Sequence, residues 1–463
     1  MRAQSLNVEQ PEVGERLRAP GRRARRATGS SVDRAVNWER ALTAVLLLQL
    51  VASAVLVGVM AVRSPINAHP DEALHLVAGQ YFREHWLPPP VGAPETATTY
   101  SRYGMSYTDE ADIVYWLFGK AAALGNGLGL APSTVMRWFQ VALYWCLVAW
   151  MVFRATTFTP AVCFLLLTPQ VWYVFSYING DALPFAMLTV VLVELGWPDS
   201  SVRSFLSGAR TGPNAGVFVV GALLGLLALS KRNYLVSIAF VGWVLLWLGH
   251  DLRHWRRATL LGLIAAAIAL PWATYHGWVN DFHTGQKIVE HAEKMAAPDM
   301  KPSAQTGPTS FPFMALRAKG VSLWDTLVTL NWVGLSFRSF CGLYGWMSIA
   351  SPAWLYDVFA VLYASLLTIV VLPAALRGSG KAWRLLLGAL VCATLVIAQS
   401  VYRSWVFDFQ GQGRYLFPIL PMLFFCWQQC EATALRSPAL VVAALLGGLG
   451  LLSFALIGLG SLA

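Results

Sequence analysis

The sequence predicts an all-α polytopic membrane protein with about eleven transmembrane helices. Of its 463 residues, 56% are hydrophobic and only 13% are charged, a composition that does not suit a soluble core with a polar shell. Mostly apolar runs of about 17 to 24 residues, enough to cross a hydrocarbon layer of roughly 30 Å as a helix, recur along the chain. These spans lie near residues 41–62, 134–153, 159–175, 182–197, 214–229, 234–249, 258–276, 354–376, 383–401, 414–430 and 438–461.

A polar leader, residues 1–38, precedes the first span and holds a basic run at residues 22–26. We expect this leader to be disordered and cytoplasmic, and residues 39–463 to form one transmembrane domain. A secretory signal is not indicated, because the following apolar run is of spanning length and has no small-residue cleavage site. We interpret the net charge of +10 as contact of the basic run with anionic membrane lipids rather than as binding of nucleic acid.

Charge in the short loops predicts the orientation of the chain. If the leader is cytoplasmic and the spans alternate, the basic residues of the short loops collect on the cytoplasmic side, as the positive-inside rule requires. These residues are Arg154, Arg203, Arg210, Arg253, Arg256, Arg257, Arg377, Lys381, Arg384 and Arg436. The long loops 63–133 and 277–353 and the short links 176–181, 230–233 and 402–413 then lie outside. We expect function at this extracytoplasmic surface.

The stretch from Asn67 to His75 concentrates ionisable groups directly after the first span. Pro70 suits the first position of a helix, which would place Asp71 and Glu72 in the first turn. Asp71 and His75, four positions apart, would then share a face. This pattern indicates a catalytic site made of Asp71, Glu72 and His75. The alternative is a plain helix start, because acids in the first turn complement the helix dipole without any chemistry.

Other acids lie on the same predicted side. Asp109, Glu110 and Asp112 follow one surface-lying helix, near residues 73–86, and open another, near 111–124. The trio is typical of a solvated helix start, with a metal site as the alternative. Further along, Asn179 or Asp181 can cap the span that begins near residue 182, or Asp181 can supply a second carboxylate at the level of Asp71.

Basic residues on the predicted outer side run against the positive-inside rule. They are Lys231, Arg232, Arg338, Arg403 and Arg414. Each can extend its charged end to lipid headgroups, whereas together near Asp71 they would form a pocket for a phosphate group. We place four further residues in this pocket as ligand-contacting groups: Asn179, Asp181, Tyr103 and Tyr415.

Cysteine and histidine spacings do not indicate a metal centre. Five cysteines lie in apolar spans as small hydrophobic residues, and Cys341 in the second long loop has no evident mate. The polar run from His283 to Glu293 lacks a recognised ligand spacing. We therefore predict no cofactor, although a divalent ion held by Asp71, Glu72 and Asp181 stays open.

Four motifs carry a resemblance to a known family: residues 69–75, 176–183, 339–346 and 412–418. In order and spacing they resemble a bacterial polytopic membrane family of unassigned function in the GT-C glycosyltransferase superfamily, and the resemblance covers nearly the whole chain after residue 40. It implies an enzyme of the bacterial plasma membrane that takes a sugar from a polyprenyl-phosphate carrier at the outer face. The acid expected to act as base corresponds to Asp71, with Glu72 beside it. The chain departs from the pattern at Gly180, where a polar residue is expected, and in having no soluble domain after the last span.

The residue chemistry fits this implied activity. Asp71 as general base would take a proton from an acceptor hydroxyl while the oxygen attacks the anomeric carbon in one inverting displacement. The cations would stabilise the charge gained by the departing polyprenyl phosphate. The acceptor would be a cell-envelope glycan, lipid or protein. The alternatives are a transporter or flippase of lipid-linked glycans, which predicts internal repeats that the sequence does not clearly show, and a ligase or polymerase of such glycans.

Overall fold

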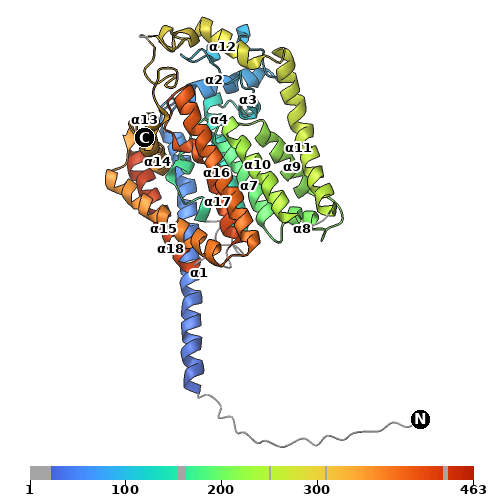
Figure 1. The fold of residues 1–463 in the computed structure, drawn as a ribbon, viewed down its shortest axis with the longest axis vertical. Helices are drawn as coiled ribbons and strands as arrows, with labels where there is room; N and C mark the ends of the chain where they lie inside the picture. Colours follow the sequence, from blue (N-terminus) through green and yellow to red (C-terminus); the bar gives the residue numbers. More distant parts are fainter. Residues whose placement is uncertain (1–21, 155–162, 250–251, 308–309, 431–435, 463) are drawn as a thin grey trace, which may run out of the picture.

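A computed structural model of the chain describes residues 22–154, 163–249, 252–307, 310–430 and 436–462. The described chain is predominantly helical, as the sequence predicts (Figure 1). Its α-helices are α1 (Arg22–Arg63), α2 (Glu72–Glu84), α3 (Ile113–Asn126), α4 (Pro132–Arg154), α6 (Pro169–Val174), α7 (Ala182–Gly196), α8 (Ser201–Ser207), α9 (Ala215–Ala228), α10 (Leu235–Leu248), α11 (Leu252–Val279), α12 (Thr284–Met295), α13 (Leu323–Leu327), α14 (Trp332–Gly342), α15 (Ala353–Arg377), α16 (Gly380–Val406), α17 (Ile419–Gln429), α18 (Arg436–Leu452) and α19 (Gly460–Leu462).

Shorter elements connect these helices. Short 3-10 helices are η1 (Pro94–Thr99), η3 (Arg232–Tyr234), η4 (Pro298–Met300), η5 (Pro302–Ala304) and η6 (Gly413–Leu416), and η7 (Ser453–Leu459) is a π-helical continuation of α18. Strands β1 (Leu343–Tyr344) and β2 (Ile349–Ala350) pair antiparallel, with Leu343 opposite Ala350.

The predicted count of about eleven spans is not confirmed. In the described chain, six helices are long and apolar enough to cross a membrane, or up to seven if the bent pair α7 and α8, at 52°, forms one span. The predicted spans near 214–229, 234–249 and 414–430 are instead helices of 14, 14 and 11 residues, which are short for a hydrocarbon layer of roughly 30 Å. Part of the predicted span 159–175 lies outside the described residues, and the rest contains only the six-residue, fully buried α6.

Helix α1 begins earlier than the sequence suggests. It starts at Arg22, within the leader that was expected to be disordered, whereas residues 1–21 lie outside the described part of the chain. The membrane-crossing portion of α1 runs over Trp38–Arg63. The helix therefore extends well beyond its apolar part on the N-terminal side (Figure 1).

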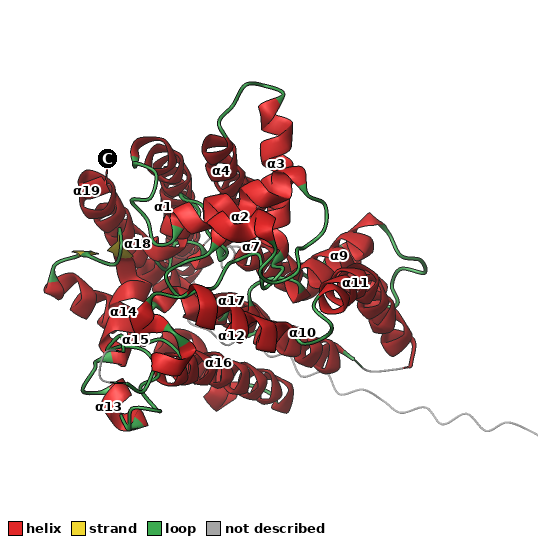
Figure 2. Cartoon of the chain, turned by 90° about the horizontal axis from the view of Figure 1, so that it is seen from above, coloured by secondary structure: helices red, strands yellow, loops and turns green. Residues whose placement is uncertain are grey.

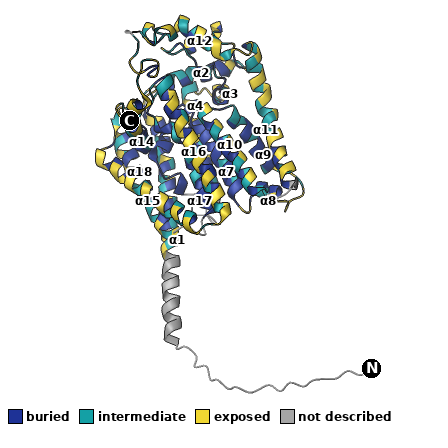
Figure 3. Ribbon diagram, viewed as in Figure 1, coloured by how far each residue is buried: buried dark blue, intermediate teal, exposed yellow. Residues whose placement is uncertain are grey.

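The core is organised around α7, which is apolar except for Thr189 and Glu194 and is buried at nearly every residue, as expected for a helix surrounded by protein. Seen from above, α7 lies between α1 and α18 on one side and α9 and α11 on the other (Figure 2). It contacts α4, α9 and α17 directly. Buried residues concentrate around α7, and exposed ones follow the outer faces of α11 and α15 (Figure 3).

Both long loops fold over the same end of the helix bundle. Helices α2, α3 and α12 gather there, opposite the start of α1 (Figure 1). The second loop is tied to the end of α16 and the residue after it by backbone hydrogen bonds, from Arg317 N to Trp405 O (2.9 Å) and from Ala315 N to Phe407 O (2.8 Å). Residues from distant parts of the sequence thereby enclose one pocket at this end.

Candidate functional site

Asp71 has an unusual backbone conformation. Helix α2 begins at Glu72, so Asp71 is its N-cap rather than part of the first turn, and it adopts the left-handed region with φ 58°. Non-glycine residues in this region are uncommon and concentrate at active sites, where the surrounding structure holds them. The conformation directs the Asp71 side chain, which is 35% exposed, into a pocket of about 200 Å³.

One oxygen of the Asp71 carboxylate has partners and the other is free. Oδ2 accepts a hydrogen bond from the Tyr107 hydroxyl (3.3 Å) and lies 4.0 Å from Arg414 Nη2. Burial raises the pKa of Tyr107 well above its usual value, so this hydroxyl stays a donor. Oδ1 has no hydrogen-bond partner among the described residues. It is therefore available to a ligand.

Two cations beside Asp71 are held by a buried acid. Asp181, fully buried behind the pocket, lies 2.8 Å from Lys231 Nζ through Oδ1 and 3.7 Å from Arg414 Nη1 through Oδ2. Arg414 Nε also donates to Gln412 Oε1 (2.6 Å). The Arg414 guanidinium thus lies near two carboxylates without a close hydrogen bond to either, which leaves donors for an anion.

Glycine lets η6 bring Arg414 into place. A Cβ on Gly413 would lie 2.2 Å from the backbone nitrogen of Phe340 in α14. A side chain at Gly413 would therefore separate η6 from α14. Glycine has no Cβ and therefore permits this close approach of the two backbones.

A third group of polar side chains completes the pocket wall. Asp408 Oδ2 accepts hydrogen bonds from the Tyr103 hydroxyl (3.3 Å) and from Gln410 Nε2 (2.7 Å), and Gln410 Oε1 accepts one from Tyr415. Asp408, Gln410 and Tyr107 are not among the site residues predicted from the sequence. Asp408 could have been found from its position, because it is an acid in a short outer link between Arg403 and Arg414, two residues predicted to bind phosphate.

The pocket brings together most of the predicted site. Its wall includes Asp71, Tyr103, Lys231, Arg232, Arg403, Arg414 and Tyr415. Arg338 does not contribute: its side chain is exposed, with the guanidinium carbon 5.7 Å from the centre of the Tyr356 ring. Asn179 is buried outside the pocket wall, where Oδ1 accepts from Asp181 N (2.8 Å) and Nδ2 donates to Tyr177 O (2.8 Å). Asn179 therefore stabilises the turn before α7. This role corresponds to the capping alternative and not to a ligand contact.

Glu72, predicted as part of the catalytic site, does not line this pocket. Its side chain is fully buried and forms a two-point ion pair with Arg137 of α4, Oε1 to Nε and Oε2 to Nη2, both at 2.7 Å. The backbone nitrogens of Asn67 and Ile178 also donate to it, at 2.9 and 3.3 Å. Glu72 opens the helix and so points into the core, away from the pocket that Asp71 faces.

His75 lies behind the pocket rather than in it. Its Nδ1 is hydrogen-bonded to the Tyr115 hydroxyl (2.7 Å), and its ring stacks on Tyr107 with 4.1 Å between centroids. Burial, with nearby Lys231 and Arg414, lowers the His75 pKa well below its usual value, so the imidazole is neutral. Asp71 and His75 both contact Tyr107, Asp71 by accepting a hydrogen bond from its hydroxyl and His75 by stacking on its ring.

The acids near residue 110 take structural places. Asp112 caps α3 by accepting from Val114 N (3.1 Å), and burial raises its pKa to about 7. Asp109 accepts from Tyr100 (2.9 Å) and from Ser106 N (3.0 Å), and burial raises its pKa to about 6. Asp112 therefore begins a helix as expected, but Asp109 and Asp112 are buried, at 2% and 7% exposure, rather than solvated, and Asp109 and Glu110 form part of the pocket wall. No cluster of three histidine, cysteine or acidic side chains suited to a metal occurs within the described ranges.

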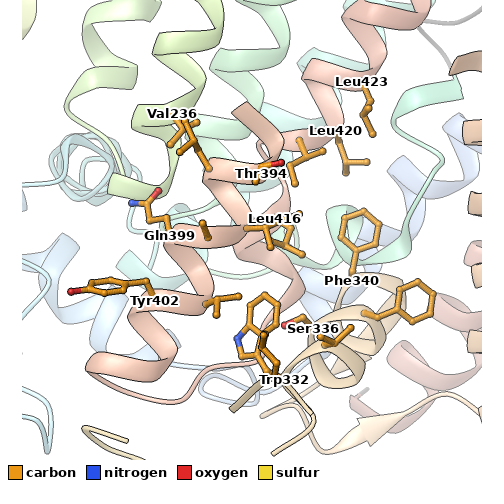
Figure 4. A pocket seen from close by; sticks show the side chains of 18 of the residues that line it. Val236, Trp332, Ser336, Phe340, Thr394, Gln399, Tyr402, Leu416, Leu420 and Leu423 are labelled. Atoms are coloured by element: carbon orange, nitrogen blue, oxygen red, sulfur yellow. The ribbon is translucent and has the colours of Figure 1, made fainter. Parts of the chain in front are cut away.

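A large apolar cavity adjoins the charged pocket. It has a volume of about 1160 Å³ and is lined by α10, α13, α14, α15, α16 and α17 (Figure 4). Gln399 of α16 belongs to the walls of both cavities. The same helix thus carries a charged pocket toward its end and an apolar surface alongside, an arrangement that suits a ligand with a polar head and a long hydrocarbon tail.

Fold and site together define a polytopic helical membrane protein with a charged pocket at one end of its bundle. The chain belongs to the DUF2142 family of predicted membrane proteins, whose model matches residues 92–423. This confirms the membrane-protein part of the sequence prediction. Neither a curated protein nor a solved structure matches the chain.

Proposed function

We propose that this protein is a GT-C-type membrane glycosyltransferase that moves a sugar from a polyprenyl-phosphate donor to a cell-envelope acceptor at the outer face of the plasma membrane. The observation that carries the proposal is the free oxygen of Asp71, held by a left-handed backbone at a pocket that contains Lys231 and Arg414. A base beside a cation pair is the constellation needed to activate a hydroxyl and to release a phosphate.

Asp71 is the general base of the proposed reaction. Its Oδ1 takes the proton of an acceptor hydroxyl while that oxygen forms a bond to the anomeric carbon. The bond from the anomeric carbon to the phosphate oxygen breaks in the same step, and the polyprenyl phosphate leaves with the electron pair. Because attack and departure occur on opposite faces, the anomeric configuration inverts. Tyr107 orients the Asp71 carboxylate by donating a hydrogen bond to Oδ2.

The leaving phosphate gains negative charge in this step, and the cations oppose it. Arg414 is buried and prepositioned, with its guanidinium 3.7 and 4.0 Å from the carboxylates of Asp181 and Asp71. A phosphate can therefore take its N–H groups without displacing a tight ion pair. Since this contact strengthens as charge develops, it lowers the barrier more than it favours ground-state binding.

The apolar cavity accounts for the lipid part of the donor. Its walls are almost entirely hydrocarbon, with Trp332, Phe340 and Leu420 among them (Figure 4). A polyprenyl chain is a long apolar group. Moving it out of the bilayer is favourable only if the protein offers an equally apolar surface. Gln399 lines both cavities, so this apolar surface adjoins the pocket that contains Lys231 and Arg414.

The proposal is tested by incubating the purified chain with radiolabelled undecaprenyl-phosphate-linked glucose, galactose and mannose and a cell-envelope fraction, and measuring donor consumption and label transfer. Asp71→Asn should lower turnover by about 10²- to 10⁴-fold, the range of a lost general base. Asp281→Asn is the matched control, because Asp281 is also an aspartate with positive φ, 53°, yet its side chain is 78% exposed outside the pocket. Undiminished transfer by Asp71→Asn would overturn the base assignment.

A further inference from the structure

Asp408 is a buried carboxylate without a cation of its own. It lies between the end of α16 and η6, is 7% exposed and forms part of the pocket wall. No basic side chain of the described residues lies within 4.0 Å of its carboxylate, unlike the buried acids Glu72 and Asp181, each of which has an ion-pair partner. Burying a carboxylate in this way is unfavourable unless another group compensates its charge.

The protein satisfies only one of the two Asp408 oxygens. Oδ2 accepts both hydrogen bonds, from Tyr103 and Gln410, while Oδ1 has no hydrogen-bond partner in the described chain. The backbone here is fixed, because Asp408 pairs with Met314 and Phe409 N donates to Phe313 O (2.9 Å). The free oxygen is thus held in place at the pocket wall, as in a prepared binding site.

Electrostatics support a ligand that donates hydrogen bonds to Asp408. Burial raises the Asp408 pKa, and the negative charge of Asp71 in the same pocket raises it further, while Tyr103, Gln410 and the more distant Arg403 lower it. A hydroxyl or ammonium group at Oδ1 would replace the lost solvation of the carboxylate. A phosphate would instead be repelled, so Asp408 cannot belong to the phosphate-binding half of the pocket.

We infer that Asp408 is the residue that recognises the donor sugar, by accepting a hydrogen bond from a hydroxyl or an ammonium group of that sugar at Oδ1. This inference rests on the proposed function and divides the pocket among three tasks. Lys231 and Arg414 take the phosphate, Asp71 faces the acceptor hydroxyl, and Asp408 sets which sugar is held between them. Tyr103 and Gln410 are positioning residues, since each acts through the Asp408 carboxylate.

The experiment compares three lipids with the detergent-purified full chain: undecaprenyl phosphate, undecaprenyl-phosphate-glucose and undecaprenyl-phosphate-glucosamine. In the wild-type protein at least one sugar-bearing lipid should bind more tightly than the sugarless lipid. Asp408→Asn should reduce this gain by about tenfold, the size of one hydrogen bond to a charged group. It should not weaken the binding of undecaprenyl phosphate, because the substitution removes a negative charge from the pocket wall. A larger loss for glucosamine than for glucose identifies an ammonium contact, and equal losses identify a hydroxyl contact.

A second variant keeps the test decisive if Asp408→Asn does not fold. Tyr103→Phe leaves the carboxylate present but removes one donor that orients it, so a smaller loss of the sugar gain is expected, and Asp281→Asn should change none of the three affinities. The inference is overturned if neither sugar improves binding to the wild-type protein, if the gain persists in the variants, or if all three lipids weaken equally. Failure of wild-type protein to bind undecaprenyl phosphate at all would instead overturn the proposed function.

Discussion

Asp71 and Glu72 are adjacent acids with opposite surroundings. Glu72 is fully buried, and both of its oxygens accept hydrogen bonds from Arg137. Asp71 is 35% exposed, has one free oxygen and lies 4.0 Å from its nearest cation. The left-handed backbone at Asp71 separates the two side chains, because it turns one into the pocket while the helix that starts at Glu72 directs the other into the core.

The partner arginines differ in the same way. Arg137 uses its guanidinium fully, since it also donates to the carbonyls of Ala61 (3.0 Å), Ser64 (2.7 Å) and Pro65 (2.9 Å) at the end of α1. Arg414 is equally buried, but its contacts to carboxylates are 3.7 and 4.0 Å long. A buried charge with complete hydrogen bonding serves structure, whereas one with spare donors can take a ligand.

Glu72→Gln should strongly destabilise the protein. Arg137 would lose its counter-charge while remaining buried, and removing one partner of a buried ion pair costs about 3–5 kcal/mol. The measurement is the temperature at which monodisperse protein in detergent is lost. Glu84→Gln, which disrupts the exposed pair with Arg83, is the control and should leave that temperature unchanged. A Glu72→Gln protein with normal thermal stability and absent turnover would return Glu72 to the catalytic site.

Arg414→Lys should lower kcat without a comparable loss of stability. Lysine keeps the charge but loses the planar fork that matches phosphate oxygens, so we expect a fall of about 10- to 100-fold, less than complete loss of a transition-state donor. Turnover, donor KM and thermal stability are measured together. Arg338→Lys is matched in chemistry and should behave as wild type, because Arg338 lies outside the pocket. Equal effects of both substitutions would contradict the phosphate assignment.

Tyr107→Phe should have the smallest effect. It removes the hydrogen bond to Asp71 Oδ2 but keeps the ring that stacks on His75. A single such bond contributes about 0.5–1.5 kcal/mol, so kcat should fall about 2- to 10-fold with little change in acceptor KM. Tyr275→Phe on α11, away from the pocket, is the control. If Tyr107→Phe raises KM and leaves kcat intact, Tyr107 contacts the acceptor instead of orienting the base.

Local pattern was sufficient for much of the fold class and part of the site. Apolar runs identify helices because a bilayer demands that backbone groups be satisfied within each span. They did not define helix lengths, since the predicted spans near 214–229 and 234–249 stop after 14 residues each. The sequence of an apolar run is the same whether the helix crosses a bilayer or lies in a protein core. The number of spans therefore depends on how the helices pack, which the local pattern does not contain.

The sequence by itself determined that the chain is a helical membrane protein and that Asp71, Lys231 and Arg414 are out of place unless they serve a site, because ionisable groups beside hydrocarbon need a compensating reason. Only the tertiary structure decided how these charges pair. Glu72 forms an ion pair with Arg137, Asp181 forms one with Lys231, and Arg338 lies outside the pocket, over the Tyr356 ring. Asp408 is connected to the site by a hydrogen bond from Tyr103, a residue distant from it in sequence. Charge type and spacing are local properties, whereas partnership depends on side-chain direction and on which helices pack together, and the local pattern contains neither.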